Sequence, residues 1–127
     1  MMTTFENLEV WRRGCQLAVD LCVATSDSRE YALKDQMQRA AISIPSNIAE
    51  GSERDSDKDF IRFLRYSKGS CGELRTQLYI SERIAKKLGK PSLDGSAEMI
   101  SETRQLSAML QGLVKSIQSR QPKTDPK

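Results

Sequence analysis

Side chains that commonly perform catalysis are sparse in this sequence. It contains no histidine, which excludes Ser-His-Asp and Cys-His catalysis and histidine-based metal sites. Its three cysteines are an odd number without a C-x-x-C pair, so neither a disulfide framework nor a zinc site is indicated. Glu50 and Glu53 could move protons, but no nucleophile, metal-ligand cluster or glycine-rich phosphate loop accompanies them. We therefore expect a protein that is not an enzyme, with no catalytic residue, no metal and no cofactor.

Basic side chains at helical spacing indicate a different chemistry, the binding of phosphate groups. Lys58, Arg62 and Arg65 follow one another at intervals of four and three, so they would line one face of a helix. Such cations bind nucleic acid because neutralising phosphates releases counterions. The candidate contacts to nucleic acid are Lys58, Arg62, Arg65, Arg12, Arg13 and Arg54. The alternative is an ordinary solvated helix face, since acidic residues such as Asp57 and Asp59 stand beside them.

The stretch Ile42–Gly51 reads ISIPSNIAEG and contains a proline where a helix is otherwise expected. A proline inside a helix removes one backbone donor and clashes with the carbonyl four residues earlier, which costs about 3 kcal/mol. The apolar residues nevertheless keep helical spacing on both sides of Pro45. We therefore expect a single helix that is kinked at Pro45.

The polar residues around this proline have two interpretations. Ser43, Ser46 and Asn47 can bond backbone groups near the kink, and Gly51 fits a C-terminal cap that allows a tight turn. Alternatively, Asn47 and Glu50 belong to a recognition or assembly surface. The residues of this candidate motif are Pro45, Ser46, Asn47, Glu50 and Gly51.

Four segments must position these groups, and each shows apolar residues at spacings of three and four. They predict helices at about residues 8–25, 30–50, 57–88 and 95–119. Ser56 and Asp59 resemble a capping box at the start of the third helix. Four amphipathic helices with short connections favour an antiparallel, up-down-up-down bundle, an all-α fold formed by a single domain of residues 1–119. The polar residues 120–127 are predicted to be a disordered tail.

In such a bundle, the starts of the first and third helices and the ends of the second and fourth helices share one end. That end would gather Arg12, Arg13, Arg54, Lys58, Arg62, Arg65, Lys115 and Arg120. The pattern of the first helix predicts a main buried stripe, widened by Val10, Leu17 and Leu21. The stripe consists of Leu8, Trp11, Cys15, Ala18 and Cys22.

Several smaller features of the helices are also predicted. Gly69 and Gly72 each cost about 1 kcal/mol in a helix interior, which suggests close approach by another backbone. The cysteines stand at apolar positions and are expected to act as small hydrophobic residues. Residues off the main stripe of the third helix either form an oligomer surface or widen the core. These residues are Ile61, Tyr66, Tyr79 and Ile80.

The overall composition bounds the function only loosely. The chain has 127 residues and a net charge of +3, from 20 basic and 17 acidic residues, so it is compatible with nucleic acid without requiring it. The first residues contain no long apolar run, and we expect neither a signal peptide nor a membrane span. Free thiols without an export signal favour the cytoplasm.

Three stretches of the sequence resemble the 23S ribosomal RNA intervening-sequence proteins, also described as S23 ribosomal protein-like. They are FENLEVWRRGCQLAVDL from Phe5, QMQRAAISIPSNIAEGSER from Gln36 and DFIRFLRYSKGSCGELRTQL from Asp59. The resemblance covers about Phe5 to Ile117 and implies a four-helix bundle that assembles into a homopentameric ring. A branch similar in fold, the accessory variability proteins of retroelements, binds nucleic acid and a reverse transcriptase. The resemblance implies no catalytic activity.

The leading hypothesis is a homopentamer that binds RNA or DNA, with structured RNA favoured, through repeated basic patches. The alternative is an assembly or adaptor protein whose ring presents a surface to a protein partner such as a reverse transcriptase. The sequence departs from the family pattern at Gly14 and Gly72, where better helix formers are expected. Asp55, Asp57 and Asp59 also dilute the positive charge after Gly51. These acidic residues weaken the hypothesis that the loop after Gly51 binds nucleic acid.

Overall fold

The computed structural model describes residues 4–120, which form the 3-10 turn η1 (Phe5–Asn7) and four α-helices. The helices are α1 (Glu9–Ala24), α2 (Tyr31–Ser52), α3 (Asp57–Lys87) and α4 (Ser96–Arg120). No residue within 4–120 belongs to a strand, so the prediction of an all-α protein with four helices is confirmed. The predicted tail lies outside the described residues except for Arg120, which is the last residue of α4.

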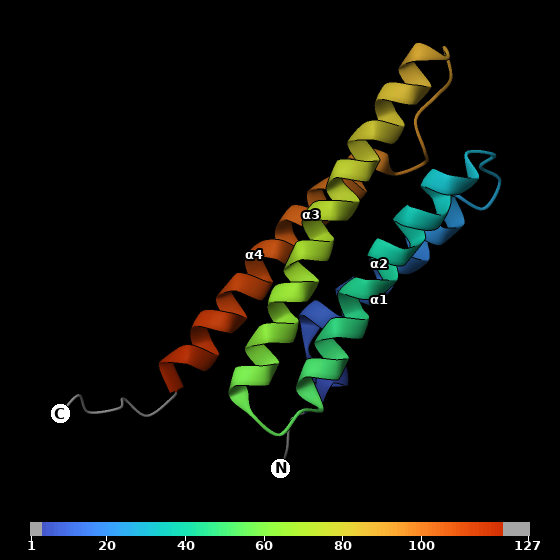
Figure 1. The fold of residues 1–127 in the computed structure, drawn as a ribbon. Coiled ribbons are helices and arrows are strands. Elements are labelled where there is room, and N and C mark those ends of the chain that lie inside the picture. The colour runs from blue at the N-terminus through green and yellow to red at the C-terminus, as the bar shows by residue number, and fades with distance from the viewer. Residues whose placement is uncertain (1–3, 121–127) are drawn as a thin grey trace.

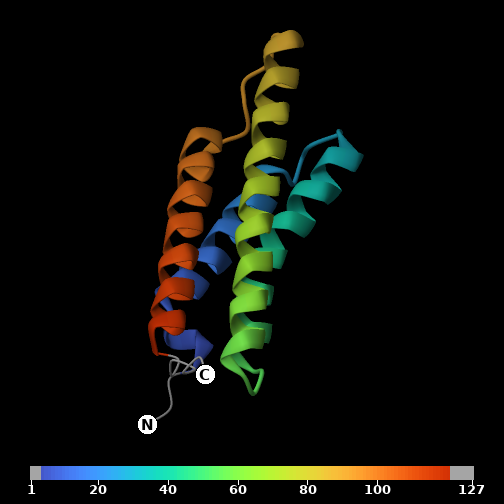
Figure 2. The ribbon, with the colours of Figure 1, turned by 60° about the vertical axis from the view of Figure 1, so that its left-hand side comes forward.

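Successive helices run in opposite directions, so the chain passes up, down, up and down (Figure 1). Each helix packs against its two neighbours, and α4 returns to contact α1. The start of α1, the α2–α3 turn and the end of α4 lie at the bottom of the molecule in Figures 1 and 2. We call this the lower end. The upper end holds the α1–α2 turn and the connection from α3 to α4.

One core is formed by apolar side chains from all four helices. Leu21, Ile44, Leu64 and Leu106 are examples, one from each helix, and all four are fully buried. Burying an apolar side chain of this size contributes about 1.5–3 kcal/mol. This shared core is therefore the main force that holds the amphipathic helices side by side.

The buried face of α1 is not centred on the predicted stripe. Gly14 and Leu17 are buried, whereas Trp11, from the predicted stripe, is only half-buried. The cause is close packing at Gly14, where a Cβ would lie 3.4 Å from Ile44 Cγ2 and 3.5 Å from Pro45 Cβ. Because α2 approaches α1 there, that side of α1 becomes part of the core. These distances are ordinary van der Waals contacts that an alanine could also make, so packing does not explain the glycine at this position.

Helix α2 continues without interruption through the buried Pro45, and the kink at this residue stays a prediction. Hydrogen-bond donors gather at the neighbouring backbone carbonyls. Asn47 Nδ2 donates to the Ser43 carbonyl oxygen at 2.9 Å and to Ser43 Oγ at 2.8 Å. Ser67 Oγ of α3 donates to the Ile44 carbonyl oxygen at 2.8 Å. Of the three predicted residues, Asn47 therefore bonds a backbone group, whereas Ser43 Oγ bonds the side chains of Asn47 and Ser70.

Gly51 does not cap α2, so that prediction is wrong. The helix continues to Ser52, and among the described glycines only Gly89 and Gly95 have a positive φ. The glycine is required for packing instead, because a Cβ at Gly51 would lie 2.7 Å from Phe63 Cβ. Gly51 therefore permits close contact between the end of α2 and the start of α3.

No other helix within residues 4–120 packs closely against Gly69 or Gly72, contrary to the prediction. A Cβ built at either residue would have no other atom of residues 4–120 within 4 Å, apart from its immediate surroundings on the helix. Both glycines are therefore surface positions of α3 where a larger side chain has room.

Helix α3 is longer than its neighbours and extends past them at the upper end (Figures 1 and 2). Its apolar stripe is buried as far as Leu78, half-buried at Ala85 and exposed at Leu88. We call residues 79–90 the α3 tip. The regular apolar spacing of α3 thus continues beyond the core that would bury it.

None of the helices within residues 4–120 combines the length and the apolar character that crossing a bilayer requires.

Candidate nucleic-acid interface

The first turns of α3 position the basic residues that the sequence singled out. Ser56 Oγ accepts a hydrogen bond from the Asp59 backbone N–H at 3.1 Å, which caps the helix. The helix therefore begins directly after Ser56, as predicted. From this start, Lys58, Arg62 and Arg65 fall on one side of α3 and line a single surface hollow.

This basic hollow has a volume of about 790 Å³ and includes residues from two helices. Asp59, Ile61 and Tyr66 of α3 and Gln118 of α4 complete it beside the three cations. The Tyr66 side chain is 51% exposed, so an aromatic ring is available next to the positive charges. Cations can hold phosphates, and an exposed aromatic ring can stack on a base.

Two arginines share one aromatic neighbour at the edge of this surface. The guanidinium carbons of Arg54 and Arg62 lie 4.8 Å and 5.1 Å from the centre of the Phe63 ring. Arg54 also pairs with Glu50 at 2.9 Å, and Arg62 pairs with Asp59 at 3.2 Å. Exposed ion pairs of this kind contribute only about 0–1 kcal/mol. A phosphate can therefore compete for these arginines at little cost.

Arg13 has a different role from the one predicted for the basic set. Its Nε donates to Glu102 Oε2 at 2.8 Å, and its Nη2 donates to Gln105 Oε1 at 2.7 Å. The hydrogen bond to Glu102 raises the pKa of Arg13. The guanidinium thus ties α1 to α4. Arg12, on the exposed side of α1, donates from Nε to the Glu6 carbonyl oxygen at 2.9 Å.

The structure therefore brings together part of the predicted set. Lys58, Arg62 and Arg65 share the hollow, and Arg54 joins Arg62 at Phe63. Neither Arg12 nor Arg13 lines this hollow.

Sequence reasoning did not place Tyr66 or Gln118 in the interface. An aromatic residue directly after Arg65 was an available signal for Tyr66, which was assigned to an oligomer surface or the core. Gln118 carries no such signal, because only the packing of α4 beside α3 brings it to the hollow.

Several polar side chains in and beside the motif around the proline are already hydrogen-bonded or ion-paired within the chain, so they are less available to a binding partner. The Asn47 amide is bonded to Ser43, and Ser43 Oγ lies 2.8 Å from Ser70 Oγ on α3. Glu50 is exposed but is paired with Arg54. Ser46 is exposed as well. The motif thus contributes mainly to the seam between α2 and α3.

The thiols differ in burial. Cys71 is fully buried, and this burial raises the pKa of its thiol to about 12. Cys15 is half-buried, and burial raises its pKa as well. Cys22 is also only half-buried. Of the three cysteines, Cys71 therefore best fits the expectation that they act as small hydrophobic residues.

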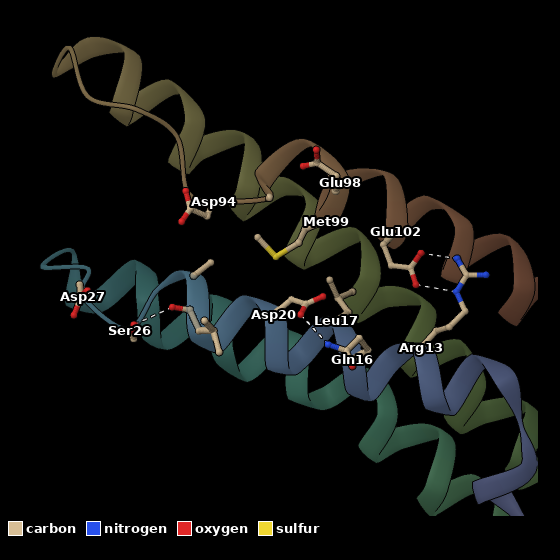
Figure 3. A pocket seen from close by; sticks show the side chains of 13 residues that line it. Arg13, Gln16, Leu17, Asp20, Ser26, Asp27, Asp94, Glu98, Met99 and Glu102 are labelled. Carbon is tan, nitrogen blue, oxygen red and sulfur yellow. Dashed lines mark hydrogen bonds and ion pairs between the residues drawn. The ribbon is translucent and has the colours of Figure 1, made fainter.

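A second hollow lies between α1 and α4, at the upper end, and has a volume of about 680 Å³ (Figure 3). Leu17 and Met99 are among the side chains that line it. We call it the acidic groove because of the carboxylates around it. These are Asp20, Asp27, Asp94, Glu98 and Glu102. The ion pair between Arg13 and Glu102 bridges the two helices at one end of the groove (Figure 3).

These features define a class of protein: a small, all-α chain of four antiparallel helices with charged surface hollows. The family model described as 23S rRNA-intervening sequence protein matches residues 6–112. The chain therefore belongs to this family, and the resemblance seen in the sequence is confirmed. No curated protein matches it.

A solved structure supports the same fold. It is a protein of unknown function from the S23 ribosomal protein family of Bacteroides thetaiotaomicron. The TM-score is 0.74 at 19% sequence identity, covering 84% of this chain and 98% of the other. At this identity the similarity establishes the fold and leaves the function to be argued from the residues.

Proposed function

We propose that this protein is a non-enzymatic, homopentameric ring that binds nucleic acid, with structured RNA as the preferred class. The observation that carries the proposal is the shared hollow of Lys58, Arg62 and Arg65. Three flexible cations on one surface suit the binding of a phosphate backbone. The proposed number of copies in the ring, five, follows from the family resemblance. The free thiols agree with a cytoplasmic location.

Binding through this hollow would depend mainly on phosphate contacts. Such contacts position a nucleic acid and carry little sequence information. Tyr66 adds a stacking surface for an unpaired base. One hollow is a weak site, but a ring repeats it, and multivalent binding can exceed the affinity of one site by about 10²–10⁴. We expect tight, salt-dependent binding with weak sequence preference.

Fluorescence anisotropy over a salt series tests the proposal. The probes are a structured RNA, a DNA duplex and single strands of each. Removing one phosphate contact reduces the slope of log affinity against log salt by about 1. We expect Lys58→Gln/Arg65→Gln to flatten the slope by about 2 for each hollow engaged. These two residues are chosen because Arg62 also contacts Asp59 and Phe63.

The matched control is Arg29→Gln/Arg39→Gln, which removes the same charge from exposed positions that do not line the hollow. Equal slopes for the two double variants would contradict a specific role of the basic hollow. No binding at low salt would contradict the nucleic-acid proposal as a whole. It would favour the adaptor alternative, to be pursued with pull-downs that survive nuclease treatment.

A further inference from the structure

The acidic groove has carboxylates that no cation within residues 4–120 neutralises. Among residues 4–120, the only ion pair at the groove is that of Arg13 with Glu102. Asp20 accepts a hydrogen bond from the neutral Gln16 amide at 2.8 Å, and no described cation lies within ion-pair distance of Asp27, Asp94 or Glu98. The groove therefore carries net negative charge.

The groove also has apolar surface. Val23, which lines it, is 68% exposed, whereas Leu17 and Met99, labelled in Figure 3, also line it but are only 2% and 4% exposed. No group of three potential metal ligands was found among the described residues. Apolar side chains combined with unneutralised carboxylates fit a segment that is both apolar and basic.

The α3 tip has that chemistry. Ile80, Ile84 and Leu88 follow one another at intervals of four and line a hollow of about 300 Å³ with Arg83 and Lys87. Ile80 is 44% exposed and Leu88 is 55% exposed. This surface is unusual for a monomer, because an apolar stripe projects from the end of the bundle and nothing within residues 4–120 covers it.

The charges on the tip are almost all positive. Between Ile80 and Lys90 the chain has four basic residues and a single carboxylate, that of Glu82. That carboxylate accepts a hydrogen bond from Ser96 Oγ at 2.9 Å, so it is engaged with the start of α4. The tip is therefore complementary to the acidic groove in both charge and apolar character.

We infer that the α3 tip of a second copy of this chain docks in the acidic groove. The tip cannot reach the groove of its own chain, because α3 is a continuous helix to Lys87 and points away from the bundle (Figures 1 and 2). Tip and groove are different surfaces, so the contact is head-to-tail and repeats from copy to copy. A ring forms if the rotation closes.

This inference rests on the self-association in the proposed function and specifies the interface that produces it. The side chains of Ile80 and Leu88 would lie against Val23, the exposed apolar side chain of the groove. The basic residues Arg83 and Lys87 would meet the carboxylates. Opposed charges would set the orientation of the copies, and the apolar contact with Val23 would add to the affinity.

Charge reversal tests the contact. The tip variant is Arg83→Glu/Lys87→Glu, and the groove variant is Asp20→Lys/Glu98→Lys. The tip variant places a negative tip against a negative groove, and the groove variant leaves the positive tip without a net opposite charge, so each should weaken self-association about a hundredfold or more. Combining all four substitutions in one chain restores opposite charges between the substituted side chains and should restore the native assembly mass. Analytical ultracentrifugation over a micromolar range measures these masses, and circular dichroism confirms helicity.

Matched controls separate this contact from a general charge effect. Asp35→Lys/Glu73→Lys makes the same charge change as the groove variant at exposed residues outside the groove, and should leave the mass unchanged. Ile80→Ser/Leu88→Ser removes apolar surface from exposed positions without reversing charge, and should also reduce the mass. Unchanged masses in the reversal variants would overturn the inference, as would a helical four-substitution chain that fails to reassemble.

The failure of this inference can be told apart from the failure of the proposed function. A native chain that assembles, binds RNA through the basic hollow and is unaffected by the reversals would overturn the tip–groove contact alone. A native chain that remains a monomer would overturn the ring itself, and this inference with it.

Discussion

At the scale of single residues, glycines decide how closely the helices of this protein pack. Gly51 has no space for a methyl group, since a Cβ would lie 2.7 Å from Phe63 Cβ and 3.2 Å from the Phe60 carbonyl oxygen. Gly72 has open space around it. Both glycines are inside helices. The same substitution should therefore have opposite effects at the two positions.

We expect Gly51→Ala to lower the free energy of unfolding by about 1–3 kcal/mol, the usual cost of overpacking. Gly72→Ala should raise it by up to about 1 kcal/mol, because alanine is the better helix former. Urea denaturation of both variants measures the two changes. A stabilising Gly51→Ala would contradict the close contact between α2 and α3.

The buried thiol of Cys71 makes stability depend on pH in the alkaline range. Its pKa is about 12 in the folded protein, against an ordinary value of 9.0. Between these values the unfolded chain loses the proton first, so unfolding becomes easier as pH rises. The contribution of the thiol is fully present below about pH 9 and declines toward pH 12. Cys71→Ala should show a shallower fall in unfolding free energy over this range, and equal slopes would contradict the prediction.

Tyr66 and Lys58 should affect nucleic-acid binding in different ways. Removing a base-stacking aromatic ring costs about 1–3 kcal/mol per base, so Tyr66→Ala should weaken binding of single-stranded RNA at all salt concentrations. Lys58→Gln should instead reduce the salt slope by about 1. Anisotropy titrations at several salt concentrations measure both. A Tyr66→Ala variant that changes only the salt slope would be inconsistent with stacking.

At the scale of helices, the α2–α3 and α1–α4 seams are held differently. Ser67 and Ser43 bond across the first seam, beside the proline. The second seam depends on Arg13 and Glu102 at one end of the acidic groove. The ion pair therefore limits how far α1 and α4 separate around the groove.

We expect Arg13→Gln to lower the free energy of unfolding by about 1 kcal/mol or less, because the pair is partly exposed to solvent. It should leave the affinity for RNA unchanged, since Arg13 does not line the basic hollow. Urea denaturation and anisotropy measure the two quantities, with Glu102→Gln as the partner in a double-mutant cycle. A loss of RNA affinity with unchanged stability would restore Arg13 to the nucleic-acid interface.

At the scale of the whole molecule, the two proposed binding surfaces lie at opposite ends of the chain. The basic hollow belongs to the lower end, whereas the acidic groove and the α3 tip belong to the upper end. Copies can therefore associate at one end and leave the basic hollows free at the other. Assembly would increase the affinity for RNA by repeating the hollow.

A mixture of the tip-reversed and groove-reversed chains gives a specific prediction about the ring. Each variant alone loses the opposition of charge at every contact and should remain a monomer. In the mixture, the substituted side chains face opposite charges only between the two variants, so the two chains must alternate. Alternation closes only rings with an even number of copies. If the native ring is a pentamer, sedimentation should show a different mass for the mixture, and a pentameric mixture would contradict the tip–groove contact.

The amino-acid sequence by itself determined the helical class of this protein and the helix that carries the basic residues. Both depend on local periodicity, which a sequence displays directly: the spacing of Lys58, Arg62 and Arg65 places them on one face of whatever helix contains them. Ser56 likewise marks the start of α3 through a contact with a residue three positions away.

Only the tertiary structure decided which side chains from different helices meet. Gly51 reads as a helix cap in the sequence, yet its function is to let α2 approach Phe63. Arg13 reads as a surface cation, yet Glu102 engages it from α4, 89 positions along the chain. The acidic groove has no local pattern, because its walls come from α1 and α4. Such contacts depend on how the helices turn and approach one another, which is set by the packing of the whole core.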